Sequence, residues 1–409
     1  MNKLLQLILF ALLLVAVFDP GDQVTHLKVP LFVGLWAIFF VGLLISKERI
    51  PTIAPSLLMY IFVFALFLPL VSILWYYVRG GHAASFDGFQ YLKSFLFLTL
   101  AAVLVAKKID AIRLLNIVLT LLSFVIIVTE ILISTQPGLI DLLWPIGDAY
   151  DLFSMGERTY GGFSYYYVYP HTAPLLVLSL AYFAYRSATS KSRARYLHVA
   201  LLLVNVVAML CSGTRNDMIF ALITPLLVFI WYSDKNQRRA LFALLLVGAV
   251  TAGIYASDII RAMADPDNES NAIRLMHLRD YSMMFSDPKT LLFGQGLGSY
   301  FYSSGFGTET SITELTYLEF IRNFGLIIAI IYYGLLLYPI RKLRNQTFKE
   351  MHFLILAYVA YLMICVSNPL LVSSSGMLVL AIVISKVFSD AESSSHAVRR
   401  AVPLRQQPA

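Results

Sequence analysis

The sequence predicts a helical protein that crosses a membrane many times, and two observations carry this prediction. Residues of the AVILMFWYC set make up 59% of the 409 positions, whereas Asp, Glu, Lys and Arg together make up only 13%. Soluble domains contain roughly 45–50% apolar and about 25% charged residues, so a water-soluble core cannot absorb this excess. Apolar runs that approach the roughly 20 residues of a bilayer span recur along the chain. We therefore expect one all-α polytopic membrane domain over residues 1–390.

The apolar runs predict about twelve transmembrane helices. In chain order they cover residues 4–18, 29–45, 54–78, 91–106, 114–134, 173–185, 196–211, 218–232, 240–254, 315–338, 351–366 and 370–388. The first run lacks a convincing small-residue cleavage site before Asp19, so we expect a retained span rather than a removed signal peptide. Residues 391–409 are expected to form a disordered cytoplasmic tail.

Basic residues alternate between the ends of these spans, as a chain with twelve spans requires. Short cytoplasmic loops retain Lys and Arg, which sets the orientation. The basic segments are 47–49, 107–113, 186–195, 235–239, 341–349 and the tail after Phe388. Both termini are therefore expected in the cytoplasm. The formal net charge of +7 follows from this topology and from contact with anionic membrane lipids, so we expect no nucleic-acid partner.

Two long connections on the opposite side, residues 135–172 and 255–314, are expected to form ordered periplasmic caps. Both are rich in aromatic residues and glycine, whereas disordered segments are poor in aromatics. The rings of the first cap, such as Tyr160, suit the apolar faces of sugars, although an aromatic belt at the lipid interface is an alternative. In the second cap, Gly294, Gln295 and Gly296 lack the strand–turn–helix context of a dinucleotide motif, which favours a closely packed turn.

Arginines on the outer side oppose the charge bias that sets the topology, so each requires a reason. Arg215 lies in a short turn before a span whose N-terminus should point outward with free N–H groups. A helix N-terminus together with a guanidinium can bind a diphosphate. The alternative is an arginine that pairs with Asp217 or reaches lipid phosphates.

A helix predicted from residue 271 to residue 285 carries the next candidates. At 100° per residue, Arg274, His277 and Tyr281 share one face, while Arg279 lies about 140° away from Arg274. Only one of these arginines can readily face a given phosphate, and we favour Arg274, with Arg279 as a further candidate. The alternative is a solvated helix face. Tyr281 is a candidate sugar-binding residue.

Candidate general bases are Glu314 and His171. Residues 311–314, Ser-Ile-Thr-Glu, predict a capping box for the helix that follows, and Glu314 could also accept a proton from a sugar hydroxyl. His171 stands at the end of the first cap. Glu319 and Arg322, three residues apart within the next span, are expected to neutralise each other as a structural pair.

We predict neither a metal site nor a cofactor. Asp19 with Asp22, and Asp265 with Asp267, could in principle hold a divalent cation against a diphosphate, but short Asp/Pro/Gly strings are typical of turns. The two cysteines, Cys211 and Cys365, lie in or next to spans and offer neither a metal cluster nor a disulfide framework.

The second half of the chain, residues 205–340, resembles the O-antigen polymerase and ligase superfamily. The motifs that carry the resemblance are Cys-Ser212-Gly-Thr-Arg215, then Arg274 ahead of Leu-Phe-Gly294-Gln-Gly-Leu-Gly298, then Thr313-Glu-Leu-Thr-Tyr317-Leu-Glu-Phe-Ile-Arg-Asn-Phe-Gly325-Leu-Ile. The resemblance implies a GT-C-like membrane fold with an outward cavity that binds undecaprenyl-diphosphate sugars without a metal. It implies that Arg215 and Arg274 bind the diphosphate. Tyr317 is a further candidate sugar-binding residue. The ligase branch carries a His-Asn pair where this chain has Glu314-Leu315.

The sequence therefore favours an inverting polysaccharide polymerase of the bacterial inner membrane, with its active face in the periplasm. Its partners would be undecaprenyl-diphosphate-linked oligosaccharides and membrane lipids, together with a chain-length regulator and a flippase. The product could be O-antigen, capsule or exopolysaccharide. One alternative is a ligase that transfers finished polymer to a lipid A core. Another is a transporter of lipid-linked oligosaccharide, which should show internal repeats and charged residues near mid-membrane, and no repeat is evident.

Overall fold

The computed structural model describes residues 2–46, 53–81, 87–160, 163–191, 193–233, 269–344 and 352–401, and these are mostly helical. The helices of the first half are α1 (Asn2–Phe18), α2 (Lys28–Ser46), α3 (Pro55–Ile61), α4 (Leu68–Val78), α5 (Gly88–Leu96), α6 (Leu100–Lys107), α7 (Ala111–Thr135), α8 (Leu139–Ala149) and α9 (Leu176–Thr189). Those of the second half are α10 (Arg193–Cys211), α11 (Arg215–Tyr232), α13 (Glu269–Phe285), α14 (Pro288–Phe293), α15 (Thr316–Arg344), α16 (His352–Ile364) and α17 (Ser374–Ala401). Short π or 3-10 turns cover Phe62–Phe67, Phe97–Thr99, Ala173–Leu175, Cys365–Ser367 and Pro369–Val372.

Seven of the described helical stretches are long and apolar enough to cross a membrane. They are Lys28–Ile45, Pro55–Val78, Gly88–Lys107, Ala111–Thr135, Arg193–Cys211, Arg215–Tyr232 and Thr316–Arg344, and shorter apolar helices cover Asn2–Phe18, His352–Ser367 and Ser374–Ser389. Large apolar side chains are exposed on several of these helices, as at Leu44 (80% exposed) and Val78 (74%). Apolar surface of this kind is suited to lipid. The chain is thus a multi-pass helical membrane protein, while the number twelve stays a prediction.

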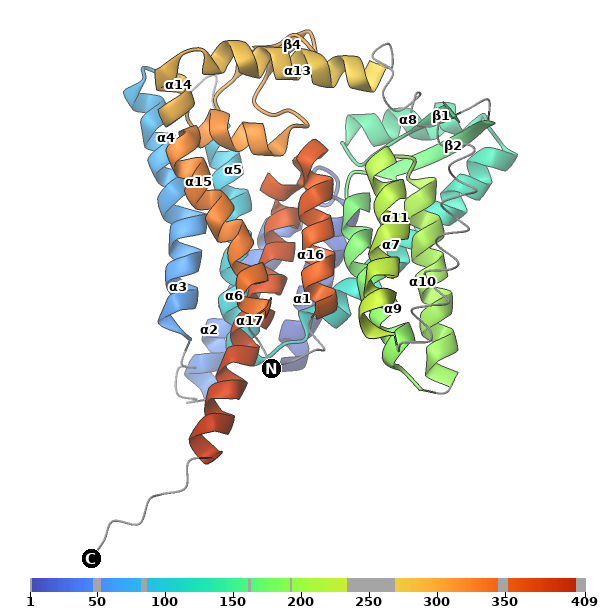
Figure 1. Ribbon diagram of the computed structural model, residues 1–409, viewed down its shortest axis with the longest axis vertical. Coiled ribbons are helices and arrows are strands. Elements are labelled where there is room, and N and C mark those ends of the chain that lie inside the picture. The colour runs from blue at the N-terminus through green and yellow to red at the C-terminus, as the bar shows by residue number, and fades with distance from the viewer. Residues whose placement is uncertain are drawn as a thin grey trace, which may run out of the picture.

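Figure 1 shows how the helices are arranged. In this view α3, α4, α5 and α15 lie on the left, whereas α7, α9, α10 and α11 lie on the right. α9 packs against α10, α11 and α16, and α17 packs against α6. α13 runs across one end of the molecule, and α8 with the strands β1 (Phe153–Tyr160) and β2 (Phe163–Pro170) lies at the same end.

Some predicted segments lie outside the described residues, and others have different ends in the structure. The predicted span 240–254, and residues 255–268 of the second cap, lie outside the described residues. α17 continues to Ala401, past residue 390, where the sequence places the end of the membrane domain. No glycine or proline interrupts the sequence between Gly376 and Pro403, so the helical hydrogen bonds can continue beyond the apolar part.

Both caps contain a β-hairpin, which the all-α prediction did not include. β1 and β2 pair antiparallel from Phe153 with Pro170 to Tyr160 with Phe163. The shorter strands β3 (Phe301–Ser303) and β4 (Thr308–Thr310) pair in the second cap. Between β1 and β2 the sequence reads Gly161-Gly162, a dipeptide typical of two-residue hairpin loops, so a local signal was present.

A kink at Gly325 within α15 explains the glycine-rich loop of the second cap. Gly325 has φ 73° and ψ 160°, which interrupts the helix. The N–H of Gln295 donates to Arg322 O (2.6 Å) and the N–H of Gly296 donates to Asn323 O (3.1 Å). The loop therefore satisfies carbonyls near the kink, which matters where water is scarce. The expected closely packed turn is confirmed: a β-carbon added at Gly294 would lie 2.5 Å from the nitrogen of Gly325.

Substitution of Gly325 by alanine is expected to destabilise the protein by roughly 1–3 kcal/mol or more, because a β-carbon meets both an unfavourable φ and a backbone clash. That β-carbon would lie 2.3 Å from Leu292 O. The control is Gly334→Ala in the same helix, where nothing lies within 4 Å of an added β-carbon. Thermal unfolding of the purified variants in detergent tests this. Equal midpoints for the two variants would contradict the assigned kink.

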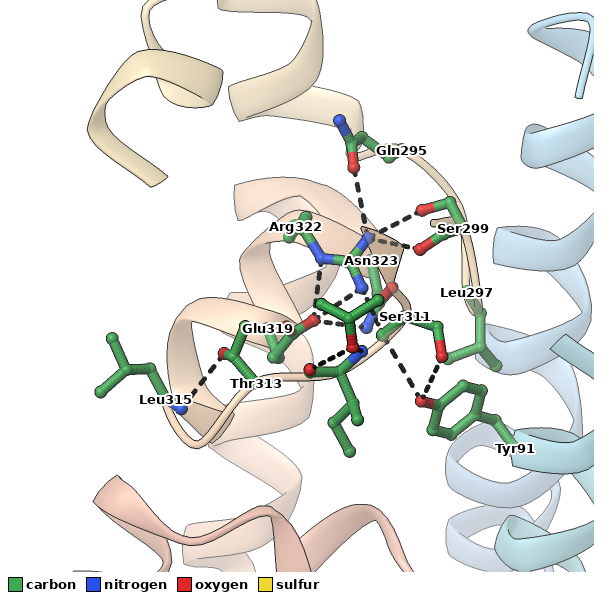
Figure 2. Close-up of polar contacts among 12 residues, drawn as sticks. Tyr91, Gln295, Leu297, Ser299, Ser311, Thr313, Leu315, Glu319, Arg322 and Asn323 are labelled. Atoms are coloured by element: carbon green, nitrogen blue, oxygen red, sulfur yellow. Dashed lines mark hydrogen bonds and ion pairs between the residues drawn. The ribbon is translucent and has the colours of Figure 1, made fainter. Parts of the chain in front are cut away.

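Glu319 and Arg322 form the buried pair that the sequence predicts (Figure 2). Arg322 Nη2 lies 2.8 Å from Glu319 Oε2, and the two side chains are 0% and 2% exposed. Arg322 also donates to Ser299 O (2.8 Å) and Ser311 O (2.7 Å). One guanidinium thus joins α15 to the glycine-rich loop and to the segment that precedes Glu314.

Candidate functional site

A cavity of about 1260 Å³ is lined by segments that are far apart in the sequence. They are the α1–α2 connection, the N-terminal ends of α2, α11, α13 and α17, residues along α5, the β1–β2 hairpin, the C-terminal end of α16 with the α16–α17 connection, and the residues just before α15. The sequence assigns all these connections to one side of the membrane. Because helix N-termini carry partial positive charge, the convergence of several favours anions in this cavity.

The cavity lining carries side chains of both charges. The cations are Lys28, Lys93, Arg158, Arg215 and Arg274, and the carboxylates are Asp22, Asp151, Glu157, Asp217 and Glu314. Four of the predicted site residues, Arg215, Arg274, Glu314 and His171, belong to this lining. Lys28, Lys93 and Arg158 were not predicted from the sequence.

Arg215 is the first residue of α11, as expected for an arginine at a helix N-terminus. Thr214 is the N-cap, and its Oγ1 accepts from the N–H of Asp217 (3.4 Å). The guanidinium of Arg215 donates to Asn271 Oδ1 (2.9 Å) at the start of α13. The N-terminus of a helix and a guanidinium therefore occur together at the cavity, which is the combination that binds phosphate oxygens.

The β1–β2 hairpin adds Arg158 beside this turn. Arg158 donates to Gly213 O (2.5 Å) and its guanidinium lies 4.5 Å from the centre of the Tyr167 ring. Gly213 has φ 72°, and a β-carbon there would lie 2.5 Å from the Tyr167 side chain. The hairpin thus packs directly on the turn before Arg215. Arg158 could not be predicted as a site residue, because no sequence motif surrounds it and only the folded protein brings it to this turn.

Arg274 and Glu314 form an ion pair at the cavity. Arg274 Nε lies 3.0 Å from Glu314 Oε2, and the side chains are 33% and 35% exposed. The predicted capping box is wrong, because α15 begins at Thr316 and the Glu314 carboxylate is turned to Arg274 instead of to a helix N-terminus. A predicted base and a predicted diphosphate ligand therefore neutralise each other in this state of the protein.

His171 is the other candidate base in the cavity lining. Its Nδ1 lies 3.0 Å from Asp151 Oδ1 and 3.0 Å from the backbone oxygen of the same residue. An Nδ1–H that donates to a carboxylate leaves Nε2 as the proton acceptor of the neutral ring. His171 is thus held in a tautomer that suits a general base.

Tyr169 and Asn368 close another part of the lining. The amide nitrogen of Asn368 donates to the Tyr169 hydroxyl. Burial raises the pKa of Tyr169 well above its usual range, and the nearby Asp217 carboxylate adds to this shift. The phenol therefore stays neutral and keeps its proton for donation at physiological pH.

The remaining predicted site residues lie elsewhere. On α13, His277 is 0% and Tyr281 1% exposed, whereas Arg279 is exposed, so His277 and Tyr281 lie on the inner face of this helix and Arg279 lies on the outer face. Tyr281 donates to Glu319 Oε1 (2.6 Å), and Tyr317 donates to Leu362 O (2.8 Å). The cavity lining does not include Arg279, Tyr281 or Tyr317. Tyr160 ends β1, and its side chain lies outside the described residues.

The predicted turn residues Asp19 and Asp22 bind backbone groups. Asp19 accepts from the N–H groups of Gln23 (3.0 Å) and Thr25 (2.7 Å), and Asp22 accepts from the N–H of Lys28 (2.9 Å). Within the described ranges, no group of three or more His, Cys, Asp or Glu residues could hold a metal ion. Asp265 and Asp267 lie outside those ranges.

Comparison with known proteins does not define the class of this protein beyond what the fold and the cavity show. No family model matches the sequence, and no curated protein matches it. The fold and the cavity define a multi-pass helical membrane protein with a charged site at one end of its helices.

Proposed function

We propose that this protein is a polysaccharide polymerase of the bacterial inner membrane. It transfers a growing glycan from undecaprenyl diphosphate to a lipid-linked repeat unit at the periplasmic face, with both termini in the cytoplasm. The observation that carries the proposal is the meeting of Arg158, Arg215 and Arg274 with several helix N-termini and His171 in one cavity. At about 1260 Å³ the cavity exceeds the roughly 300–1,000 Å³ of pockets for drug-sized ligands, so sugars and a diphosphate have room.

The arginines would stabilise the leaving group. A hydroxyl of the acceptor sugar attacks the anomeric carbon of the donor glycan, and the bond from that carbon to the diphosphate oxygen breaks. Negative charge then grows on the departing diphosphate, so prepositioned guanidinium groups and helix N–H groups favour the transition state over the ground state. Direct displacement inverts the anomeric centre. The side chains of Arg158, Arg215 and Arg274 take this role.

Of the two candidate bases, His171 suits the free protein better than Glu314. Asp151 fixes the tautomer of His171, whereas the Glu314 carboxylate already pairs with Arg274. The acceptor proton would pass to His171 Nε2. Glu314 would hold Arg274 in place until a diphosphate arrives. The tyrosines of β2 would supply ring faces to the sugars, and grooves between the helices would hold the polyprenyl chains in the membrane.

The two bases can be separated by substitution. His171→Gln is expected to lower the polymerisation rate by about 10²–10⁴-fold, the usual contribution of a general base, whereas Glu314→Gln should lower it much less. His198→Gln serves as the control, because His198 does not line the cavity. Rates are measured with purified protein and a saturating lipid-linked acceptor. A His171→Gln variant as active as the control would assign the base to Glu314.

The function itself is tested by deletion of the gene in the producing strain. Surface and lipid-linked glycans are then compared on gels. A polymerase predicts that single repeat units still reach the surface acceptor while the long ladder disappears. Polymer that accumulates on the polyprenyl carrier would assign a ligase instead. Repeat units that stay on the cytoplasmic side would assign a transporter of lipid-linked oligosaccharide.

Polymerisation also fits the resemblance to the O-antigen polymerase and ligase superfamily in residues 205–340. A polymerase of O-antigen, capsule or exopolysaccharide would act together with a flippase that delivers the repeat units and a regulator of chain length. These partners belong to the proposal. Neither a metal nor a cofactor is required by the roles given to the arginines and His171.

A further inference from the structure

Lys28 is a buried cation in the wall of the cavity. It is the first residue of α2 and only 3% exposed. Its ammonium group donates to Pro20 O and to Ser374 Oγ (3.0 Å). Among the residues that the structure describes, no carboxylate forms an ion pair with Lys28. Asp22 and Asp19 lie close enough to attract the charge of Lys28, but the ammonium group donates its two hydrogen bonds to uncharged oxygens. An ammonium group has three N–H donors, so an anion within the cavity could accept a charge-assisted hydrogen bond from it.

The α1–α2 connection holds Lys28 in this position. Burial acts to raise the pKa of Asp19, but hydrogen bonds from Thr25, Gln23 and Val24 outweigh it, so the net shift is downward and the group stays ionised. Asp22 accepts from the N–H of Lys28. The two carboxylates therefore order the backbone of the connection and attract the charge of Lys28 from a distance, while the hydrogen bonds of the ammonium group go to uncharged oxygens.

Lys93 provides a second cation near Lys28 in the cavity wall. Both lysines line the cavity, and they are close enough for their charges to repel each other. Lys93 is exposed and forms no ion pair or hydrogen bond with any described residue. Asp22 and Asp19 offset this repulsion at Lys28, whereas an anion between the two ammonium groups would be attracted by both lysines. Ser374 adds a hydroxyl at the N-terminus of α17, next to Lys28.

The lysines and the arginines come from different parts of the fold. Lys28, Lys93 and Ser374 belong to α2, α5 and α17, whereas the arginines belong to β1, α11 and α13. In Figure 1, α5 lies with the left-hand helices and α11 with the right-hand ones. One cavity therefore contains two cationic clusters on separate elements.

We propose that Lys28 and Lys93 form a second diphosphate subsite, distinct from the arginine cluster. This inference rests on the proposed function. Transfer between two lipid-linked substrates requires two diphosphates in the cavity at the same time, and their mutual repulsion demands separate cationic groups. The arginine cluster binds the donor diphosphate, which leaves, whereas the lysine cluster binds the acceptor diphosphate, which stays attached to its sugar throughout.

The test counts bound diphosphate lipids. The purified full-length protein is placed in nanodiscs of phosphatidylcholine and titrated with geranylgeranyl diphosphate, and native mass spectrometry counts the molecules bound. The variants are Lys28→Met, Lys93→Gln and Arg215→Gln. Lys289→Gln is the matched control, because Lys289 is exposed on α14 and does not line the cavity. Since Lys93 is exposed, Lys93→Gln tests the subsite even where the loss of Lys28 impairs folding.

We expect two bound molecules for the wild type and the control. Loss of a charge-assisted contact should weaken binding at one site about tenfold or more. Lys93→Gln should lose the lysine site and keep the arginine site, whereas Arg215→Gln should lose the arginine site and keep the lysine site. One bound molecule that only Arg215→Gln removes would overturn the second subsite and leave the proposed function intact. No binding by the wild type would overturn both. Displacement from the lysine site by phosphatidylglycerol in the nanodisc would assign that site to a phospholipid headgroup and overturn the acceptor role.

Discussion

Arg215→Ala is expected to abolish the long glycan ladder and to lower the polymerisation rate by roughly 100-fold or more. The guanidinium stands at the N-terminus of α11, where helix N–H groups and Arg158 converge on the same cavity. Removal of one preorganised group that stabilises transition-state charge costs about 10²–10³ in rate in well-studied enzymes. Loss of the contact between Arg215 and Asn271 should affect the structure less than the rate. α13 is also held by other contacts, such as the hydrogen bond from Tyr281 to Glu319.

The matched controls for this experiment lie on α13. Arg274→Ala should also lower the rate, because Arg274 lines the cavity, whereas Arg279→Ala on the exposed face of the same helix should not. Ladder length is measured in the deletion strain complemented with each variant, at equal amounts of protein in the membrane. An Arg215→Ala variant that is well expressed and fully active would show that Arg215 does not bind the diphosphate. Equal losses of activity in Arg279→Ala and Arg274→Ala would contradict the assignment of Arg274 to the cavity and of Arg279 to the exposed face of α13.

The helices could be predicted from the sequence because their signals are local. A run such as residues 114–134 is apolar enough to identify a span by itself, and the described helix Ala111–Thr135 matches it. The face of α13 could be predicted for the same reason. Regular 100° spacing places Arg274, His277 and Tyr281 together in any helix, and the buried side chains agree.

The composition of the cavity could be predicted only in part, because its walls depend on contacts between distant segments. Arg215 was found because an arginine on the outer side contradicts the charge bias of the topology. Lys28 and Lys93 carry no such signal, since a lysine at the end of a span is ordinary. Only the folded protein brings them to the same cavity as Arg215.

Glu314 shows how a tertiary contact overrides a local motif. The residues Ser311 and Glu314 have the spacing of a capping box, and a helix does follow. Arg274, forty residues earlier, nevertheless attracts the Glu314 carboxylate. A charged partner offers more than a backbone N–H, so the helix begins at Thr316, four residues after the start at Ile312 that a capping box at Ser311 implies. Sequence spacing alone cannot reveal such a competitor.

Arg322→Ala is expected to destabilise the protein by about 3–5 kcal/mol, the usual cost of leaving one partner of a buried ion pair uncompensated. Glu319 is 2% exposed and would remain buried, with the uncharged donors Tyr281 and Asn323 as its partners. The guanidinium also binds Ser299 and Ser311, so the glycine-rich loop and the segment before Glu314 would lose their common anchor (Figure 2). We therefore expect a fall in the unfolding midpoint together with a loss of activity.

Two further variants distinguish the stability lost through the unpaired carboxylate of Glu319 from the stability lost with the contacts of Arg322 to the loop. Arg341→Ala removes an exposed arginine from the same helix and should leave the unfolding midpoint nearly unchanged. Glu319→Gln combined with Arg322→Met removes both charges, so part of the stability should return, although the contacts to Ser299 and Ser311 stay lost. Thermal unfolding in detergent measures all three. If the double variant is no more stable than Arg322→Ala, the contacts of Arg322 to the loop, rather than the unpaired carboxylate of Glu319, determine the stability of this region.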